Sequence, residues 1–107
     1  MTIIIENKKA TREGRKGVFS YSTTGRMKTG YLVYDEAQQN IGIVYSCDDD
    51  REDKKHRYGM AEIFFDEKYE QEHDRTWKII KINGDYLPFD ELEKIMSKNE
   101  RYALNID

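Results

Sequence analysis

The sequence holds one cysteine, one proline and two histidines among its 107 residues, and it has no long apolar run. Because Cys47 has no second cysteine to pair with inside the chain, a reducing compartment is expected, and the sequence predicts a cytoplasmic protein with a buried thiol. The apolar stretch at residues 2–5 is too short for a signal-peptide core and follows no basic residue. No run approaches the roughly 18 apolar residues of a membrane span, so neither secretion nor membrane insertion is expected.

The scarcity of histidine also weighs against catalysis. His56 and His73 both fall in highly charged segments, where nothing would hold an imidazole in one orientation. The aspartates at 48–50 are consecutive, whereas a calcium loop needs alternating ligands and a glycine at its bend. Residues 25–30 match the first half of a phosphate-binding P-loop, but the next two residues are not the Lys and Ser or Thr that it requires. The sequence thus predicts no enzyme, no metal and no cofactor.

The chain is rich in charge and in aromatic rings. Charged residues make up 36% of it and hydrophobic residues 37%, and there are eight Tyr, four Phe and one Trp. These rings supply enough apolar area to argue against disorder. A chain of this length holds one domain, residues 1–107. The abundance of Ile, Lys and Tyr is typical of AT-rich bacterial and phage genomes.

The charge is sorted along the chain. Residues 1–30 carry seven bases and two acids, a net charge of +5, and residues 31–75 carry six bases and thirteen acids, a net charge of −7. The remaining residues, 76–107, are nearly neutral, with five bases and six acids. A basic end and an acidic middle attract different partners, or each other, and this favours a binding function.

Apolar residues mostly alternate along the chain, and this period of two predicts β-strands. The expected strands are residues 18–21, 30–34, 41–47, 58–65, 77–82 and 85–87, with a further strand at 1–5 on a sheet edge. Residues 18–21 and 30–34 are expected to pair as a hairpin. Asn83-Gly84 favours a type I′ turn between residues 77–82 and 85–87, because both residues tolerate a positive φ.

The alternation also assigns a face to each strand residue. One face of the strand at 41–47 is expected to carry Ile41, Ile43, Tyr45 and Cys47. In the strand at 58–65, Ala61, Ile63 and Phe65 are expected on one face, and Met60 and Phe64 on the other. Residues 77–82 point either Ile80 and Ile82 or Trp77 and Ile79 inward.

A helix is expected near the C-terminus. Pro88 fits its first position, and Phe89, Leu92, Ile95 and Met96 form an apolar stripe at helical spacing. The charged segments 48–57 and 66–75 are expected to be solvated loops. The sequence therefore predicts a strand-dominated α+β domain of five to six antiparallel strands with one C-terminal helix. The strands form either a curled sheet or a small SH3-like or OB-like barrel.

The expected binding surface is an outward aromatic patch rimmed by cations in the first third of the chain. Its residues are Arg15, Lys16, Tyr21, Thr24, Arg26, Lys28, Tyr31 and Tyr34. Exposed tyrosines give a large contact area, and the cations would steer the surface toward an acidic partner. The expected function is a small non-enzymatic intracellular factor that binds another protein, such as a regulator, an inhibitor or an immunity-type protein of bacterial or phage origin.

Three alternatives for the partner stay open. Basic residues beside strand aromatics are also what single-stranded nucleic-acid binders use. The loop at residues 22–29 combines hydroxyl groups with Arg26 and Lys28, a set that suits a nucleotide or another small anion. A homodimer is compatible with an uncapped sheet edge and with the opposite charges of the two regions.

Overall fold

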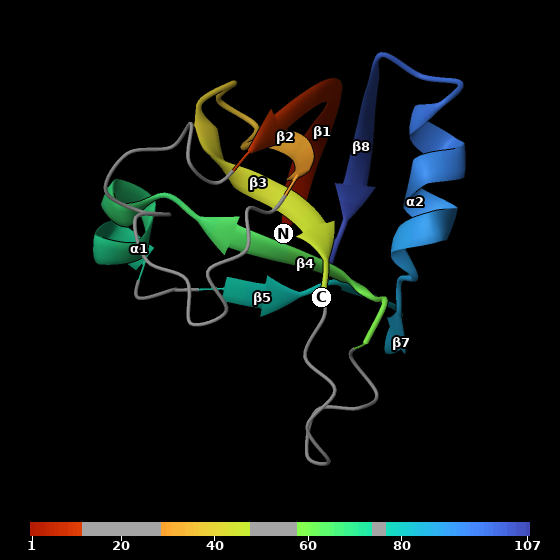
Figure 1. Cartoon of the computed structure of the whole chain (residues 1–107). Coiled ribbons are helices and arrows are strands. Elements are labelled where there is room, and N and C mark those ends of the chain that lie inside the picture. Colours follow the sequence, from red (N-terminus) through yellow and green to blue (C-terminus); the bar gives the residue numbers. More distant parts are fainter. Residues whose placement is uncertain (12–28, 48–57, 74–76) are drawn as a thin grey trace.

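The structure, a computed structural model, describes residues 1–11, 29–47, 58–73 and 77–107 (Figure 1). In these ranges the chain forms the strands β1 (Thr2–Thr11), β2 (Thr29–Tyr34), β3 (Asn40–Ser46), β4 (Ala61–Phe65), β5 (Trp77–Ile79), β6 (Lys81–Ile82), β7 (Asp85–Tyr86) and β8 (Arg101–Asn105). It also forms the helices α1 (Glu67–His73) and α2 (Phe89–Met96).

Six of these strands form one antiparallel sheet in the order β5-β4-β3-β2-β1-β8. Its end strands, β5 and β8, do not pair with each other in the part of the chain described, so the sheet is open and not a barrel. This confirms the strand-dominated α+β fold and decides between its two predicted forms. The prediction that the first strand lies on a sheet edge is wrong, because β1 lies between β2 and β8.

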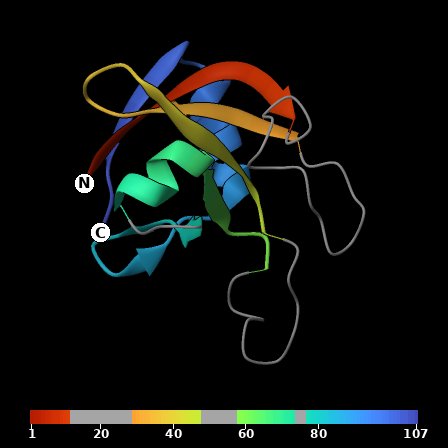
Figure 2. The same ribbon diagram turned by 90° about the vertical axis from the view of Figure 1, so that its left-hand side faces the viewer.

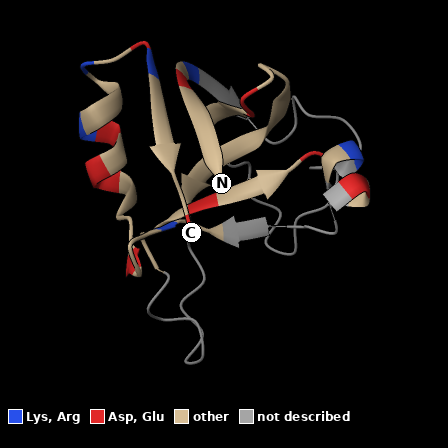
Figure 3. Cartoon of the chain, turned by 180° about the vertical axis from the view of Figure 1, so that it is seen from behind, with Lys and Arg blue, Asp and Glu red and all other residues tan. Residues whose placement is uncertain are grey.

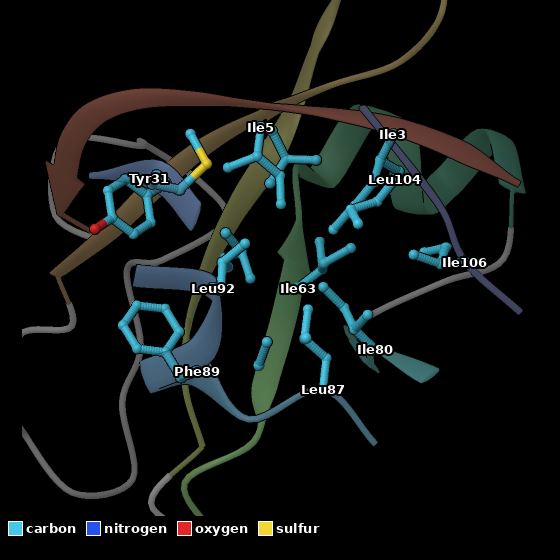
Figure 4. Packing of buried hydrophobic residues seen from close by; sticks show 14 of the residues in the cluster. Ile3, Ile5, Tyr31, Ile63, Ile80, Leu87, Phe89, Leu92, Leu104 and Ile106 are labelled. Carbon is cyan, nitrogen blue, oxygen red and sulfur yellow. The ribbon is translucent and has the colours of Figure 1, made fainter. Parts of the chain in front are cut away.

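The main core lies between the sheet and α2, on the face shown in Figure 4. Phe89, Leu92 and Met96 of α2 are buried, and Ile95 packs partly against the same cluster, which confirms the predicted apolar stripe. Pro88 is the residue just before the helix, at its N-cap, and not its first residue. Its fixed φ suits that place, and its missing N–H leaves no donor to satisfy. Because α2 has only eight residues, its stability depends on this packing.

The predicted turn at Asn83-Gly84 is confirmed. Both residues have positive φ, 52° and 86°, and they connect the antiparallel pair β6 and β7. The Asp107 carboxylate accepts hydrogen bonds from the backbone N–H groups of Asn83, at 3.1 Å, and Gly84, at 2.9 Å. The predicted strand at 77–82 is split into β5 and β6, which belong to different sheets. Of its two predicted orientations the first is confirmed, because Ile80 is buried and Ile82 packs on the core.

The predicted hairpin partner of β2 is replaced by other strands. Both edges of β2 are occupied, one by β1 and the other by β3 (Figure 2). Residues 18–21, the partner that the alternation predicts, lie outside the described residues. β1 and β2 are far apart in the sequence, so no local pattern predicts that they pair.

The predicted faces of β3 are only partly right. Ile43 and Tyr45 pack with Phe64 in a small second cluster, whereas Ile41 and Val44 belong to the main core. The register with β2 shifts between Val33 and Tyr34, so Ile41 is an extra residue in β3. Such a β-bulge reverses the alternation, and it explains why Ile41 and Ile43 face opposite ways. In β4 the predicted faces are confirmed, since Phe64 joins the second cluster while its neighbours Ile63 and Phe65 join the main core.

Two elements were not predicted. Residues 67–73 form α1 where a solvated loop was expected, and the Tyr69 ring stacks on the buried Phe65 ring with centroids 4.9 Å apart. Tyr69 thus packs a helix whose other residues are polar against the main core. The second element is β8, whose Leu104 is buried and whose pairing with β1 closes one side of the core.

Candidate functional site

Six of the eight predicted binding residues lie outside the described part of the chain. They are Arg15, Lys16, Tyr21, Thr24, Arg26 and Lys28. The other two, Tyr31 and Tyr34, are on β2, and successive positions of a strand bring residues three apart to opposite faces. The structure therefore separates these two tyrosines.

Tyr31 is a core residue. Its side chain is 4% exposed, and its ring stacks on that of Phe89 with centroids 6.0 Å apart (Figure 4). The prediction that Tyr31 belongs to an outward aromatic patch is wrong. The reason is that α2 covers this face of β2, and alternation alone does not indicate which face a helix covers.

Tyr34 is half-buried on the opposite face, and a cation lies beside it. The Arg101 guanidinium is 5.1 Å from the centroid of the Tyr34 ring, and its Nη2 donates a hydrogen bond to Gln38 Oε1. The cation beside this ring belongs to β8 and is none of the predicted binding residues. No local sequence pattern connects two residues so far apart in the chain.

The described residues also form a cleft at the start of α2. Its volume is about 500 Å³, and it is lined by Ser46, Gly59, Met60, Pro88, Phe89, Asp90 and Glu93. Met60, Pro88 and Phe89 are its apolar lining residues, here called the cleft floor, while Asp90 and Glu93 are exposed acidic residues. Tyr58, next to Gly59 in the chain, is 59% exposed.

Three chain segments hold the cleft together through backbone hydrogen bonds. Cys47 N donates to Met60 O over 2.9 Å, and Gly59 N donates to Cys47 O over 2.7 Å. Phe89 N donates in turn to Gly59 O over 2.9 Å, and Met60 and Pro88 form a β-bridge. Residues 59–60 thus join the end of β3 to the start of α2. The positive φ of Gly59, 77°, suits this turn, and a Cβ atom added there would meet open space.

The charge of the cleft has one sign. Asp90 and Glu93 are three residues apart on α2, which places both on one side of the helix. None of the lining residues that the structure describes is basic. The N-terminus of α2 carries about half a positive charge from the helix dipole, and two carboxylates outweigh it. Figure 3 shows the acidic bands on this part of α2, with basic residues at its other end.

Few of the residues named in the predictions about catalysis and metals lie in the described part of the chain. His56 lies outside the described part of the chain, and His73 is the last residue of α1. Within the described ranges there is no group of three or more His, Cys, Asp or Glu side chains placed to hold a metal ion. Cys47 is buried, 3% exposed, as its place at the end of an apolar run predicts.

Sequence reasoning missed the cleft because it depends on contacts between distant segments. Asp90 and Glu93 are visible in the sequence, but by themselves they indicate only an acidic first half of the expected helix. Nothing local indicates that Ser46 and Met60 would lie beside them. The one available signal was the spacing of Phe89, Asp90 and Glu93, which predicts an apolar and acidic side of one helix.

Comparison with known proteins gives no relative, since no family model, curated protein or solved structure matches the chain. No helix in the described residues has the length and apolar character needed to cross a membrane.

Proposed function

We propose that this protein is a non-enzymatic protein-binding domain, and that its cleft at the start of α2 receives a basic side chain of the partner. The observation that supports this proposal is the pairing of an apolar floor with two carboxylates and no base in the lining described. A lysine or arginine side chain has the same two parts, an apolar stem and a charged head. Regulators, inhibitors and immunity-type proteins act by binding of this kind.

The two parts of the cleft would have different roles. The carboxylates of Asp90 and Glu93 would contact the ammonium or guanidinium head, while Met60 and Phe89 would contact the methylene stem. Each ion pair of exposed groups contributes only about 0.2–1 kcal/mol. One inserted side chain therefore fixes the position of a partner, and most of the affinity must come from the surface around the cleft.

A lysine tripeptide tests this proposal. Capped Gly-Lys-Gly is titrated into ¹⁵N-labelled protein, and the amide resonances are followed by NMR. We expect shifts concentrated at the lining residues, with a dissociation constant in about the millimolar range, because few contacts are made. Capped Gly-Glu-Gly should leave these resonances unchanged.

Matched variants distinguish binding at the cleft from a general attraction to acidic residues of the protein. The double substitution Asp90→Asn and Glu93→Gln should weaken lysine binding roughly twofold to thirtyfold, from the loss of two such ion pairs. Glu91→Gln is the control, because Glu91 is exposed on the same helix and does not line the cleft. Equal weakening by both variants, or shifts that avoid the lining residues, would refute a specific role for the cleft.

The other candidate partners stay predictions. The sites expected for an acidic partner, a nucleic acid or a small anion all depend mainly on residues 12–28, which lie outside the described part of the chain. The cleft does not favour an anion, since its two carboxylates would repel one. A gel shift at low salt tests nucleic-acid binding, because phosphate contacts weaken steeply as salt rises. Thermal shift in the presence of nucleotides tests the small-anion alternative.

We also propose that the protein works in the cytoplasm. The single cysteine, which cannot pair within the chain, supports a reducing compartment.

A further inference from the structure

The outer edge of β8 carries backbone groups with no partner in the described structure. Met1 and Ile106 exchange two hydrogen bonds, Met1 N to Ile106 O at 3.0 Å and Ile106 N to Met1 O at 2.7 Å. Antiparallel pairing alternates, so Leu104 and Tyr102 also direct their N–H and C=O groups toward β1. Residues Arg101, Ala103 and Asn105 then direct theirs away from the sheet. No hydrogen bond to these outward groups is found among the described residues.

We propose that β8 pairs with β8 of a second copy of this chain, antiparallel and centred on Ala103. The two sheets would then join into one continuous sheet across a two-fold axis. Ala103 would face Ala103 of the second copy, and Arg101 would face Asn105 of the second copy. This interface is separate from the cleft, so the inference does not rest on the proposed function.

Backbone hydrogen bonding favours this register. Three outward residues face three outward residues, which allows roughly six inter-strand hydrogen bonds. A shift by two residues in either direction leaves one outward residue of each copy unpaired. A shift by four in one direction places Arg101 opposite Arg101 of the second copy, and like charges directly opposite each other destabilise a sheet.

The side chains of β8 are self-complementary in the proposed register. On the outer face the small Ala103 lies at the axis, flanked on each side by an Arg101–Asn105 pair. On the inner face the half-buried Tyr102 meets Leu104 of the second copy, and this contact would extend the main core across the interface. No two like charges face each other. A second copy of the same strand is therefore a suitable occupant of this edge.

The three outward residues of this edge are accessible, and the open part of the edge ends after them, because the N–H of Asp107 donates to Lys81 O over 2.9 Å. Arg101, Ala103 and Asn105 are all exposed, and β8 contains no proline and no bulge in its pairing with β1. Natural edge strands commonly avoid pairing by means of proline, bulges or several charges, and β8 has one charged residue. The opposite edge, β5, has only three residues, so it offers fewer outward groups.

Opposite charges at Ala103 test the interface and its register together. Lysine at Ala103 would place two ammonium groups opposite each other at the axis, and Ala103→Glu would place two carboxylates there. Sedimentation velocity should show the unsubstituted chain as a dimer at about 1 mM and each variant as a monomer, with at least tenfold weaker association. An equal mixture of Ala103→Lys and Ala103→Glu should form a dimer again, because opposite charges then meet.

Ala37 supplies the matched control. It is exposed in the turn between β2 and β3, beside the Gln38 that accepts a hydrogen bond from Arg101, and Ala37→Lys adds the same charge outside β8. This variant should dimerise like the unsubstituted chain. A monomeric unsubstituted chain at the highest concentration would overturn the proposal. So would a dimer that survives Ala103→Lys, or a mixture of the two variants that stays monomeric while circular dichroism shows both to be folded.

Discussion

The cleft and the β8 edge offer a partner opposite kinds of interaction. The cleft presents side chains, two carboxylates together with apolar residues, held by three segments of the chain. The β8 edge presents backbone groups in a regular row, and its side chains are mainly small or uncharged. Side-chain charge selects a partner by its chemistry, whereas backbone pairing selects by register and shape. A sheet and one short helix thus give one small chain two surfaces whose binding has different physical causes.

The largest expected effect comes from a substitution in the core, which should weaken binding at both surfaces at once. Leu92 is fully buried in α2, and Leu92→Ala should lower the free energy of unfolding by about 2–5 kcal/mol, as truncation of a core leucine does. Because α2 lines the cleft at one end and leads into β8 at the other, lysine binding and dimerisation should weaken together. Urea denaturation measures the stability. Glu91→Ala, exposed on the same helix, should change it by about 0.5 kcal/mol or less.

Salt should affect the two surfaces unequally. Between about 0.05 and 0.5 M salt, lysine binding at the cleft should weaken roughly threefold, because exposed ion pairs are screened. Dimerisation depends on neutral backbone groups, so its dissociation constant should change less than about twofold over the same range. NMR titration and sedimentation velocity in matched buffers give the two values. A dimer more salt-sensitive than the cleft would mean that charge, and not backbone pairing, holds the copies together.

The smallest expected effect is that of a substitution at one surface on binding at the other surface. Monomeric Ala103→Lys should bind capped Gly-Lys-Gly with the affinity of the unsubstituted chain, within about twofold, because distant sites act additively. In the same way, Asp90→Asn with Glu93→Gln should leave dimerisation unchanged. Coupling in either direction would show that the two surfaces are parts of one interface.

Local patterns in the sequence predicted local structure well. The Asn83-Gly84 turn, the apolar stripe of α2 and the faces of β4 all follow from residues within a few positions of one another. The pairing of β1 with β8 joins the two ends of the chain, and no local pattern indicates it. The bulge at Ile41 reversed an alternation that would otherwise have assigned the faces correctly.

The candidate site was the harder prediction for the same reason. Tyr31 and Tyr34 were correctly placed on a strand, but only the position of α2 decides that Tyr31 is buried. The cleft combines Ser46, Met60 and Asp90 from three separate segments. Its chemistry depends on tertiary contacts, and these are absent from periodicity and from charge counts.

The contact between an inserted lysine and the cleft floor is the most direct test of the proposed function. Intermolecular nuclear Overhauser effects can be recorded between capped Gly-Lys-Gly and the protein, with Met60 methyl and Phe89 ring protons assigned. We predict cross-peaks from the lysine methylene protons to both groups, and weaker cross-peaks at the same peptide concentration in the variant that carries Asp90→Asn and Glu93→Gln. Lysine methylene cross-peaks that reach neither Met60 nor Phe89 at saturating peptide would contradict the account.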